Sequence, residues 1–207
     1  SPKRSEKDVD QKRNRKTPSW CGSRKRKAAC TPYDARITEY AHQGHLVPPR
    51  SILKTPEQIV GIRESGKINI AVLDHVAAHI KAGMTTAEID RLVFEKTKEL
   101  GGVPAPLGYR GFPKSICTSV NEVICHGIPD ARPLEDGDLV KIDCTAFYDG
   151  VQGDNGATLY CGEVDEESRL LTERTLESLN RAIKAVKPGR PISVIGRVIE
   201  SYARRFG

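Results

Sequence analysis

The stretch VKIDCTAFYDGVQGD, residues 140–154, decides the fold and holds one side chain that strands rarely carry. Val140, Ile142 and Cys144 alternate as the apolar face of a strand does, and Asp143 lies between them. Burying a lone carboxylate is strongly unfavourable, so such a residue normally has a partner, a proton or a metal ion. Asp143 therefore indicates a polar site on this strand.

A hairpin turn supplies a candidate partner for that carboxylate. Asp149-Gly150 is the strongest short-range signal for a two-residue turn, and β-favouring residues flank it on both sides. With that turn, Thr145 faces Asp154, and Asp143 and Asp154 become diagonal neighbours on one face of the hairpin. Diagonal Cβ atoms lie roughly 7 Å apart, which is close for two carboxylates and a suitable span for a divalent cation between them.

Turn formation is the alternative role for an aspartate in this sequence. Aspartate in a Gly-Asp or Asp-Gly pair usually forms a turn, and this interpretation suits Asp136, Asp138 and Asp149. It suits Asp143 poorly, because that residue lies in the middle of a strand. For Asp154 both interpretations stay open, since a register slip of one residue would move its side chain to the other face.

Composition narrows the class of protein. A chain of 207 residues with 38% hydrophobic content fits one globular domain with an appendage. No apolar run in the sequence approaches the ~20 residues of a membrane span, and the N-terminus lacks the apolar core of a signal peptide. Six cysteines without regular spacing favour a reducing compartment over a disulfide scaffold. We expect a soluble, cytoplasmic monomer without membrane contact.

The positive net charge belongs to the N-terminal part of the chain. Residues 1–50 contain 13 Lys and Arg against 5 Asp and Glu, whereas residues 51–207 contain 20 against 22. We therefore divide the chain into a basic, largely disordered leader, residues 1–50, and a nearly neutral folded part, residues 51–207. Such a leader favours weak, salt-dependent contact with polyanions such as ribosomal RNA. Its few aromatic residues argue against sequence-specific RNA reading.

The leader contains a degenerate knuckle-like segment. WCGSRKRKAAC, residues 20–30, resembles the SEC-C zinc knuckle, in which outer and inner ligands surround a Gly-Ser and a basic run. Cys21 and Cys30 match, but a serine and a threonine stand where the outer ligands should be. Tetrahedral zinc needs four ligands. We expect a knuckle that has lost zinc, with His42 and His45 as the alternative way to complete a site.

Residues 31–50 and the segment after them differ in helical character. Residues 31–50 are predicted to be a polar connector without a helix, because the Pro-Pro pair at its end disfavours helical backbone. A first helix is predicted from Thr55-Pro56, which supply its cap and its first-turn proline, to Gly83. The apolar face of this helix would consist of Ile59, Ile62, Ile70, Leu73, Val76 and Ile80.

The remaining order of elements is typical of an α+β layered fold. Four further segments are predicted: a second helix at residues 86–100, a β-rich region at residues 103–164, and two helices at residues 166–186 and 192–206. His75 and His79 lie one helical turn apart, a spacing that can chelate a metal. No third ligand accompanies them in sequence, so we interpret them as surface or satisfied side chains.

Five stretches of the chain resemble the type I methionine aminopeptidases, and the resemblance extends over residues 52–207. The His-Gly-Ile-Pro block and the two aspartates eleven residues apart are specific in combination. The stretches are TPEQIVGIRESGKI (55–68), MTTAEIDRLV (84–93), PLGYRGFPKSICTSVNEVICHGIP (106–129), LEDGDLVKIDCTAFYDGVQGD (134–154) and VKPGRPISVIG (186–196).

The resemblance implies a pita-bread α+β fold, in which two similar halves surround a pair of divalent ions, with Co, Mn, Fe and Zn as candidates. It also implies metal-assisted hydrolysis that removes the initiator methionine from nascent peptides with a small second residue. Carried over residue by residue, Asp143 would bind one ion and Asp154 would bridge both. His126 would contact the substrate and stabilise the tetrahedral intermediate without binding metal. The methionine pocket would be lined by Tyr109, Phe112 and Cys117.

The family completes its site with a histidine and two glutamates C-terminal to the last residue of this chain. We therefore expect the N-terminal portion of such an enzyme, with two of five ligands, no activity of its own and a large apolar sheet face left uncovered. One alternative is a non-catalytic, ribosome- or RNA-associated relative. Another is a proline-specific peptidase of the same fold, which the NEVICHGIP block and the compact set of pocket residues disfavour.

Overall fold

The chain forms two compact units. The computed structural model describes residues 31–47 and 52–207, so the first part of the leader, with Cys21 and Cys30, lies outside the described residues. One unit, which we call the sheet unit, comprises residues 54–180. The other combines the N-terminal segment with residues 181–207. The predicted hairpin ligands Asp143 and Asp154, with His126, Tyr109, Phe112 and Cys117, all fall in the sheet unit.

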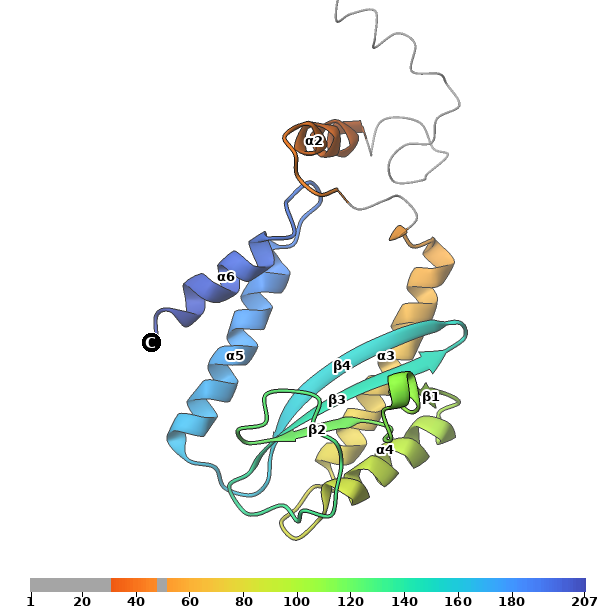
Figure 1. The fold of residues 1–207 in the computed structure, drawn as a ribbon, viewed down its shortest axis with the longest axis vertical. Helices are drawn as coiled ribbons and strands as arrows, with labels where there is room; N and C mark the ends of the chain where they lie inside the picture. The colour runs from red at the N-terminus through yellow and green to blue at the C-terminus, as the bar shows by residue number, and fades with distance from the viewer. Residues whose placement is uncertain (1–30, 48–51) are drawn as a thin grey trace, which may run out of the picture. The chain divides into compact units, whose positions relative to one another are not determined.

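The predicted hairpin forms the centre of the sheet unit (Figure 1). Strand β3, Leu139–Tyr148, pairs antiparallel with β4, Val151–Tyr160. Asp149 and Gly150 both have left-handed backbone, with φ values of 48° and 78°, as a type I′ turn requires. Thr145 therefore faces Asp154, and the predicted register is confirmed.

Two short strands complete a four-stranded antiparallel sheet around β3. Strand β1, Val103–Pro104, pairs with the C-terminal end of β3, and β2, Cys117–Val120, pairs with its N-terminal half. Strand β4 pairs along the whole length of β3. The β-rich region predicted for residues 103–164 is thus confirmed, and β3 is the strand that all the others share.

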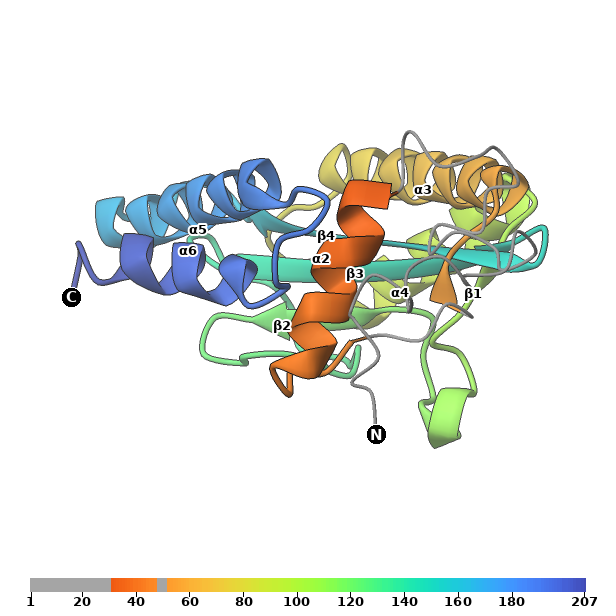
Figure 2. The same ribbon diagram turned by 90° about the horizontal axis from the view of Figure 1, so that it is seen from above.

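Two helices cover one face of this sheet (Figures 1 and 2). Helix α3, Pro56–Ala77, lies against β3 and β4, and α4, Thr86–Glu99, lies beside α3. Each helix begins with a capping box in which a threonine and a side chain three residues later exchange hydrogen bonds. The core between these layers consists of Ile68, Val72, Val76, Ile89, Val93, Ile116, Val120, Leu134, Val140, Ile142, Cys144, Ala146 and Cys161.

The buried face of α3 differs from the predicted apolar face. Ile59 and Ile70 are exposed, whereas Ser65 and Asn69 are buried. Ser65 Oγ donates to the carbonyl of Ala146 at 2.8 Å and accepts from the N–H of Gly153, also at 2.8 Å. The polar residues are buried because they bind strand backbone directly, which an apolar pattern does not register.

Gly153 lets α3 lie directly on β4. A Cβ atom at this position would lie 2.5 Å from the backbone nitrogen of Gly66 and 2.6 Å from the carbonyl carbon of Ser65. Asn69 Nδ2 donates to the carbonyl of Gly153 at 2.5 Å. The close approach fixes β4, and with it the neighbouring Asp154, relative to α3.

The outer face of the hairpin is polar, so the expectation of a large apolar face is wrong for this sheet. Residues at odd positions of β3 and even positions of β4 point away from the helices. Leu139, Phe147 and Tyr160 lie at the strand ends. Between them this face carries Lys141, Asp143, Thr145, Gln152, Asp154 and Thr158.

The prediction of a connector without a helix at residues 31–50 is wrong, because Thr31–His42 form helix α2. Its C-terminal end is closed around Gly44, whose φ is 83°. The N–H of Gly44 donates to Ala41, and the N–H of His45 donates to Tyr40, the bond pair of a Schellman motif. The Pro-Pro pair restricts only the residue before it, so it leaves this helix unaffected.

The other helices agree with the sequence in place but less well in length. Helix α3 ends at Ala77, before Gly83. Helix α5, Glu166–Ala185, matches its prediction closely, and α6, Val194–Ala203, is shorter than predicted at both ends. Among the described residues, no helix has the length and apolar character needed to cross a membrane.

Candidate metal centre and substrate site

Asp143 and Asp154 lie on the outer face of the hairpin, on neighbouring positions of β3 and β4. Asp143 is half-buried and Asp154 is exposed. Thr145 lies directly opposite Asp154, and its Oγ1 donates to Asp154 Oδ1 at 3.2 Å. The structure therefore brings the two predicted metal ligands together on one face, as the hairpin register requires.

The electrostatics of Asp143 reflect this neighbourhood. Burial raises the pKa of Asp143 above its usual value, and the charge of Asp154 raises the pKa further. Lys141 and His126 act in the opposite direction and favour the charged carboxylate. A carboxylate whose ionisation is disfavoured by burial and by a neighbouring carboxylate is one that a cation would stabilise.

Cys117 adjoins the acidic pair from β2. It lies directly opposite Asp143 in the strand pairing. Burial raises the pKa of its thiol, and the nearby Asp143 and Cys125 raise the pKa further. Cys144, on the helix-covered face, has a pKa raised to about 12, mainly by burial. The Cys117 thiol is therefore not an activated nucleophile, and its place in the methionine pocket stays a prediction.

His126 lies in the loop between β2 and β3 and in electrostatic range of Asp143. Its backbone is left-handed, with a φ of 56°, which is unusual for a residue with a Cβ atom. The next residue, Gly127, exchanges hydrogen bonds with β2: its carbonyl accepts from Thr118 N–H at 2.9 Å, and its N–H donates to Ser119 Oγ at 3.2 Å. The predicted catalytic histidine thus acts electrostatically on Asp143, and its role toward substrate stays a prediction.

Tyr109 and Phe112 belong to a separate loop. Tyr109 opens a short 3-10 turn, Tyr109–Gly111, and its ring is 64% exposed under the guanidinium of Arg110, 5.5 Å from the ring centroid. Phe112 follows the turn and is half-buried. Their place in a methionine pocket stays a prediction.

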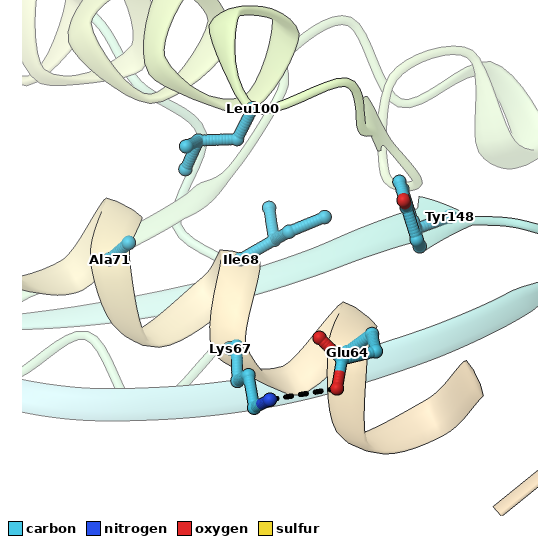
Figure 3. A pocket seen from close by; sticks show the side chains of 6 residues that line it. All are labelled: Glu64, Lys67, Ile68, Ala71, Leu100 and Tyr148. Atoms are coloured by element: carbon cyan, nitrogen blue, oxygen red, sulfur yellow. Dashed lines mark hydrogen bonds and ion pairs between the residues drawn. The ribbon is translucent and has the colours of Figure 1, made fainter. Parts of the chain in front are cut away.

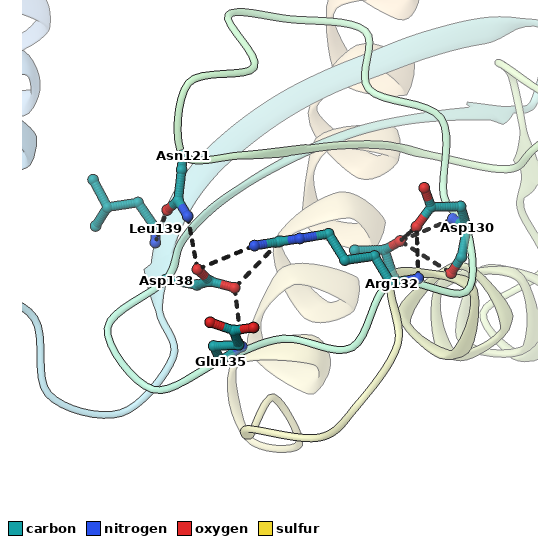
Figure 4. A network of polar contacts seen from close by, with 7 residues as sticks. Asn121, Asp130, Arg132, Glu135, Asp138 and Leu139 are labelled. Carbon is teal, nitrogen blue, oxygen red and sulfur yellow. Dashed lines mark hydrogen bonds and ion pairs between the residues drawn. The ribbon is translucent and has the colours of Figure 1, made fainter.

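The base of the His126 loop is closed by a network that centres on Asp138 (Figure 4). The Asp138 carboxylate accepts from Asn121 Nδ2 at 2.7 Å and from the N–H of Glu135 at 3.0 Å, and it pairs with Arg132 at 3.3 Å. Burial alone would raise the pKa of Asp138, but these donors hold it below its usual value. Sequence reasoning read Asp138 only as a turn former. The signal that could have identified this role is Asn121, which follows β2 and donates to Asp138.

A second anchor closes the other side of the loop. Asp130 N–H donates to Thr86 Oγ1 at 2.8 Å, and its carbonyl accepts from the N–H of Ala87 at 2.8 Å. Asp130 Oδ1 also accepts from the N–H of Arg132 at 2.9 Å (Figure 4). The segment that carries His126 is therefore tied to the start of α4 as well as to β3.

A cavity of about 200 Å³ lies elsewhere in the sheet unit (Figure 3). Ile68, Ala71 and Leu100 form its apolar wall, and an ion pair between Glu64 and Lys67 lies beside it. Its remaining lining residue, Tyr148, occupies an even position of β3 and so points to the helix-covered face. The cavity is therefore on the opposite side of the sheet from the acidic pair and does not belong to the candidate site.

The acidic pair supplies two candidate metal ligands, Asp143 and Asp154. Within residues 31–47 and 52–207, no three or more His, Cys, Asp or Glu side chains gather in a group that could hold a metal ion. The rings of His75 and His79 contact each other at a tilt of 47° with centroids 4.4 Å apart, and His79 Nδ1 forms a hydrogen bond with the carbonyl of His75. This agrees with their interpretation as satisfied side chains.

Comparisons with known proteins place this geometry in a family. The chain is 54% identical over 155 residues to methionine aminopeptidase 2 of Mycobacterium tuberculosis, which covers 75% of this chain and 54% of that protein. It is 42% identical over 202 residues to the methionine aminopeptidase of Chlamydia trachomatis, covering 93% of this chain and 68% of that protein. The aligned part of this chain in the Chlamydia match is longer than residues 51–207, so the match extends into the N-terminal segment.

A solved structure agrees with the fold. The crystal structure of methionine aminopeptidase from Rickettsia prowazekii superimposes with a TM-score of 0.72 at 39% identity, covering 73% of this chain and 61% of that chain. The α+β pita-bread fold expected from the sequence is thereby confirmed. The chain spans about half the length of the first relative, and residues 60–207 match the family model of metallopeptidase M24. The chain belongs to metallopeptidase family M24 and is a relative of the methionine aminopeptidases.

Proposed function

We propose that this chain carries part of the active site of a methionine aminopeptidase, which removes the N-terminal methionine from nascent peptides by metal-dependent hydrolysis. The observation that carries the proposal is the acidic pair, Asp143 and Asp154, on one hairpin face with His126 beside it. The names of the relatives support methionine as the residue released. They favour this reaction over cleavage next to proline.

The donor chemistry of the pair fits a divalent cation. Both ligands are carboxylates, the hard oxygen donors that such ions accept, and their mutual repulsion disfavours the metal-free ionised pair. We propose that Asp143 and Asp154 would hold the divalent metal, with Co, Mn, Fe and Zn as candidates. When bound, the metal supplies Lewis acidity to the peptide carbonyl and to the attacking water.

The residues of the chain have separate roles in this proposal. Thr145 occupies one oxygen of Asp154 and so orients the carboxylate. His126 donates a hydrogen bond to the substrate carbonyl as negative charge develops on its oxygen. Tyr109, Phe112 and Cys117 line the slot for the methionine side chain, with Cys117 next to Asp143. We further propose a monomer that acts in the cytoplasm on peptides with a small second residue.

With Asp143 and Asp154 as its two metal ligands, the 207-residue chain is expected to have no turnover of its own. Two carboxylates hold a divalent ion weakly, because a fixed site needs more ligands. Isothermal titration with Mn²⁺ is expected to show weak binding that disappears in Asp143→Asn and Asp154→Asn. It should persist in Asp74→Asn, an exposed aspartate of α3 that serves as the control.

Two results would contradict this proposal. Mn²⁺ binding that is equal in the wild type and both hairpin variants would remove the acidic pair as the metal site. Chelator-sensitive release of methionine from Met-Ala peptides by the 207-residue chain would show that the chain is active alone.

A second candidate function is binding to RNA or the ribosome without catalysis. It is favoured by the excess of Lys and Arg in residues 1–50, and by residues 181–207 of the same compact unit, which carry seven Lys and Arg against one Glu. Ribosome pelleting in rising salt tests this function. Deletion of residues 1–27 is expected to reduce pelleting and its salt dependence. Unchanged association after that deletion would refute the role of the leader.

A further inference from the structure

Lys141 and Ser119 form a polar platform next to the acidic pair. They lie directly opposite each other in the pairing of β2 with β3. Lys141 is two positions before Asp143 in β3, so the two side chains leave the strand on the same outer face. Ser119 is buried and Lys141 is half-buried. The proposed metal site and its mechanism assign no role to either residue.

The platform holds the loop on both sides of His126. Lys141 Nζ donates to the carbonyl of Ile124, two residues before the histidine. Ser119 Oγ accepts from the N–H of Gly127, immediately after it, at 3.2 Å. The backbone on both sides of the histidine is thus held by hydrogen bonds to adjacent strands.

The backbone around His126 needs this support. A left-handed backbone is disfavoured for a residue with a Cβ atom, so the free loop would tend to another conformation. Gly127 also lies too close to β2 to accept a side chain, because a Cβ atom there would clash with the carbonyl of Thr118. The loop is therefore pressed onto β2 in a conformation that other contacts must maintain.

We propose that Lys141 and Ser119 are positioning residues that hold His126 beside Asp143. The inference rests on the proposed function, in which His126 contacts the substrate. Lysine suits the position because its stem spans the distance from the strand to the loop while its ammonium group supplies a charge-assisted hydrogen bond. Serine suits the opposite position because its short hydroxyl accepts an N–H that comes close to the strand.

Amide hydrogen exchange of the loop tests the proposal in the full chain. In Lys141→Met, which keeps the length and removes the donor, exchange at residues 124–127 is expected to rise about tenfold or more, the factor for losing a hydrogen bond to a charged group. Lys141→Arg should restore protection. Lys96→Met is the matched control, since Lys96 is another partly buried lysine with an ion pair, to Glu99 on α4.

Ser119→Ala provides the second arm. Ser119→Ala is expected to speed amide exchange at Gly127 with little change in far-UV circular dichroism. If Lys141→Met does not fold, Ser119→Ala alone tests the positioning proposal. Exchange at residues 124–127 that stays within a factor of two of wild type in Ser119→Ala, or that Lys96→Met raises as much as Lys141→Met, would overturn the proposal.

The exchange readout separates the proposal from the function on which it rests. It needs neither metal nor peptide, so failure of Mn²⁺ binding would remove the proposed function and leave the exchange result intact. Conversely, unaltered exchange in both variants would remove the positioning role while the acidic pair still bound Mn²⁺.

Discussion

At the contact between α3 and β4, the same glycine-to-alanine change is expected to destabilise the fold at Gly153 and to stabilise it at the facing Gly66. Gly153→Ala places a methyl group 2.5 Å from the nitrogen of Gly66, so α3 must move away from the strand. Overpacking of this kind is unfavourable by about 1–3 kcal/mol. The movement also weakens two buried hydrogen bonds, in which the Gly153 N–H donates to Ser65 Oγ and Asn69 Nδ2 donates to the Gly153 carbonyl, each contributing about 1 kcal/mol. The expected total is a destabilisation of about 3 kcal/mol.

Gly66→Ala is the matched control on the other side of the same contact. A Cβ atom at Gly66 would have only Asn155 Oδ1 within reach, at 3.9 Å, an ordinary contact distance. Alanine in a helix is favoured over glycine by about 0.5–1 kcal/mol. Gly66→Ala is therefore expected to stabilise the fold slightly, although it lies against the position where the same change is harmful.

Thermal unfolding followed by circular dichroism measures both effects. For a unit of this size, Gly153→Ala is expected to lower the melting temperature by roughly 10 °C and Gly66→Ala to raise it by roughly 2 °C. The reasoning is refuted if Gly153→Ala melts within about 2 °C of the wild type, because the close approach of helix and strand would then not exist. Equal destabilisation by both variants would point to a general loss of glycine flexibility instead.

Three further outcomes are expected. The pKa of Asp143 is raised by burial and by Asp154, so repulsion within the acidic pair destabilises the fold as the pH rises through that pKa. Asp154→Asn should therefore raise the melting temperature of the metal-free protein at pH 7 and leave it unchanged at pH 3. The reverse pattern would exclude repulsion. Asp138 has a lowered pKa, so its contribution is fully present above pH 3.8 and is lost as the pH falls through the lowered pKa. Urea unfolding should therefore show Asp138→Asn weaker than the wild type by about 2 kcal/mol at pH 7, with a difference that shrinks as the pH is lowered below 3.8. Iodoacetamide at pH 8 should modify the exposed Cys125 and spare the buried Cys144, whose pKa is about 12. Mass spectrometry of the labelled peptides measures both reactions. Fast labelling of Cys144 in the folded protein would contradict its burial.

The hairpin could be predicted because its determinants are local. The Asp149-Gly150 turn fixes the pairing by itself, and alternation then assigns each side chain to a face. Asp143 and Asp154 followed from those two rules without any information about distant parts of the chain. The helix start at Thr55 followed in the same way from its capping residue and the proline after it.

The missed features depend on contacts between distant segments. Ser65 is buried because it bonds to strand residues more than 80 positions away, and the pattern of apolar residues carries no trace of such a bond. Lys141 and Asp138 likewise serve the His126 loop through partners 17 residues earlier. Helix α2 is a different case: its end signal, Gly44, is local, and the prediction gave too much weight to the prolines that follow.

The two-residue turn between β3 and β4 constrains how this segment can change in evolution. Side chains of a strand alternate between faces, so an insertion of one residue after Asp149 would turn the Asp154 side chain toward α3, where Gly153 now leaves no space. An insertion of two residues would return it to the outer face, one rung displaced. Length variation at this position should therefore obey a parity rule, with odd insertions eliminated by selection in any relative that retains the carboxylate.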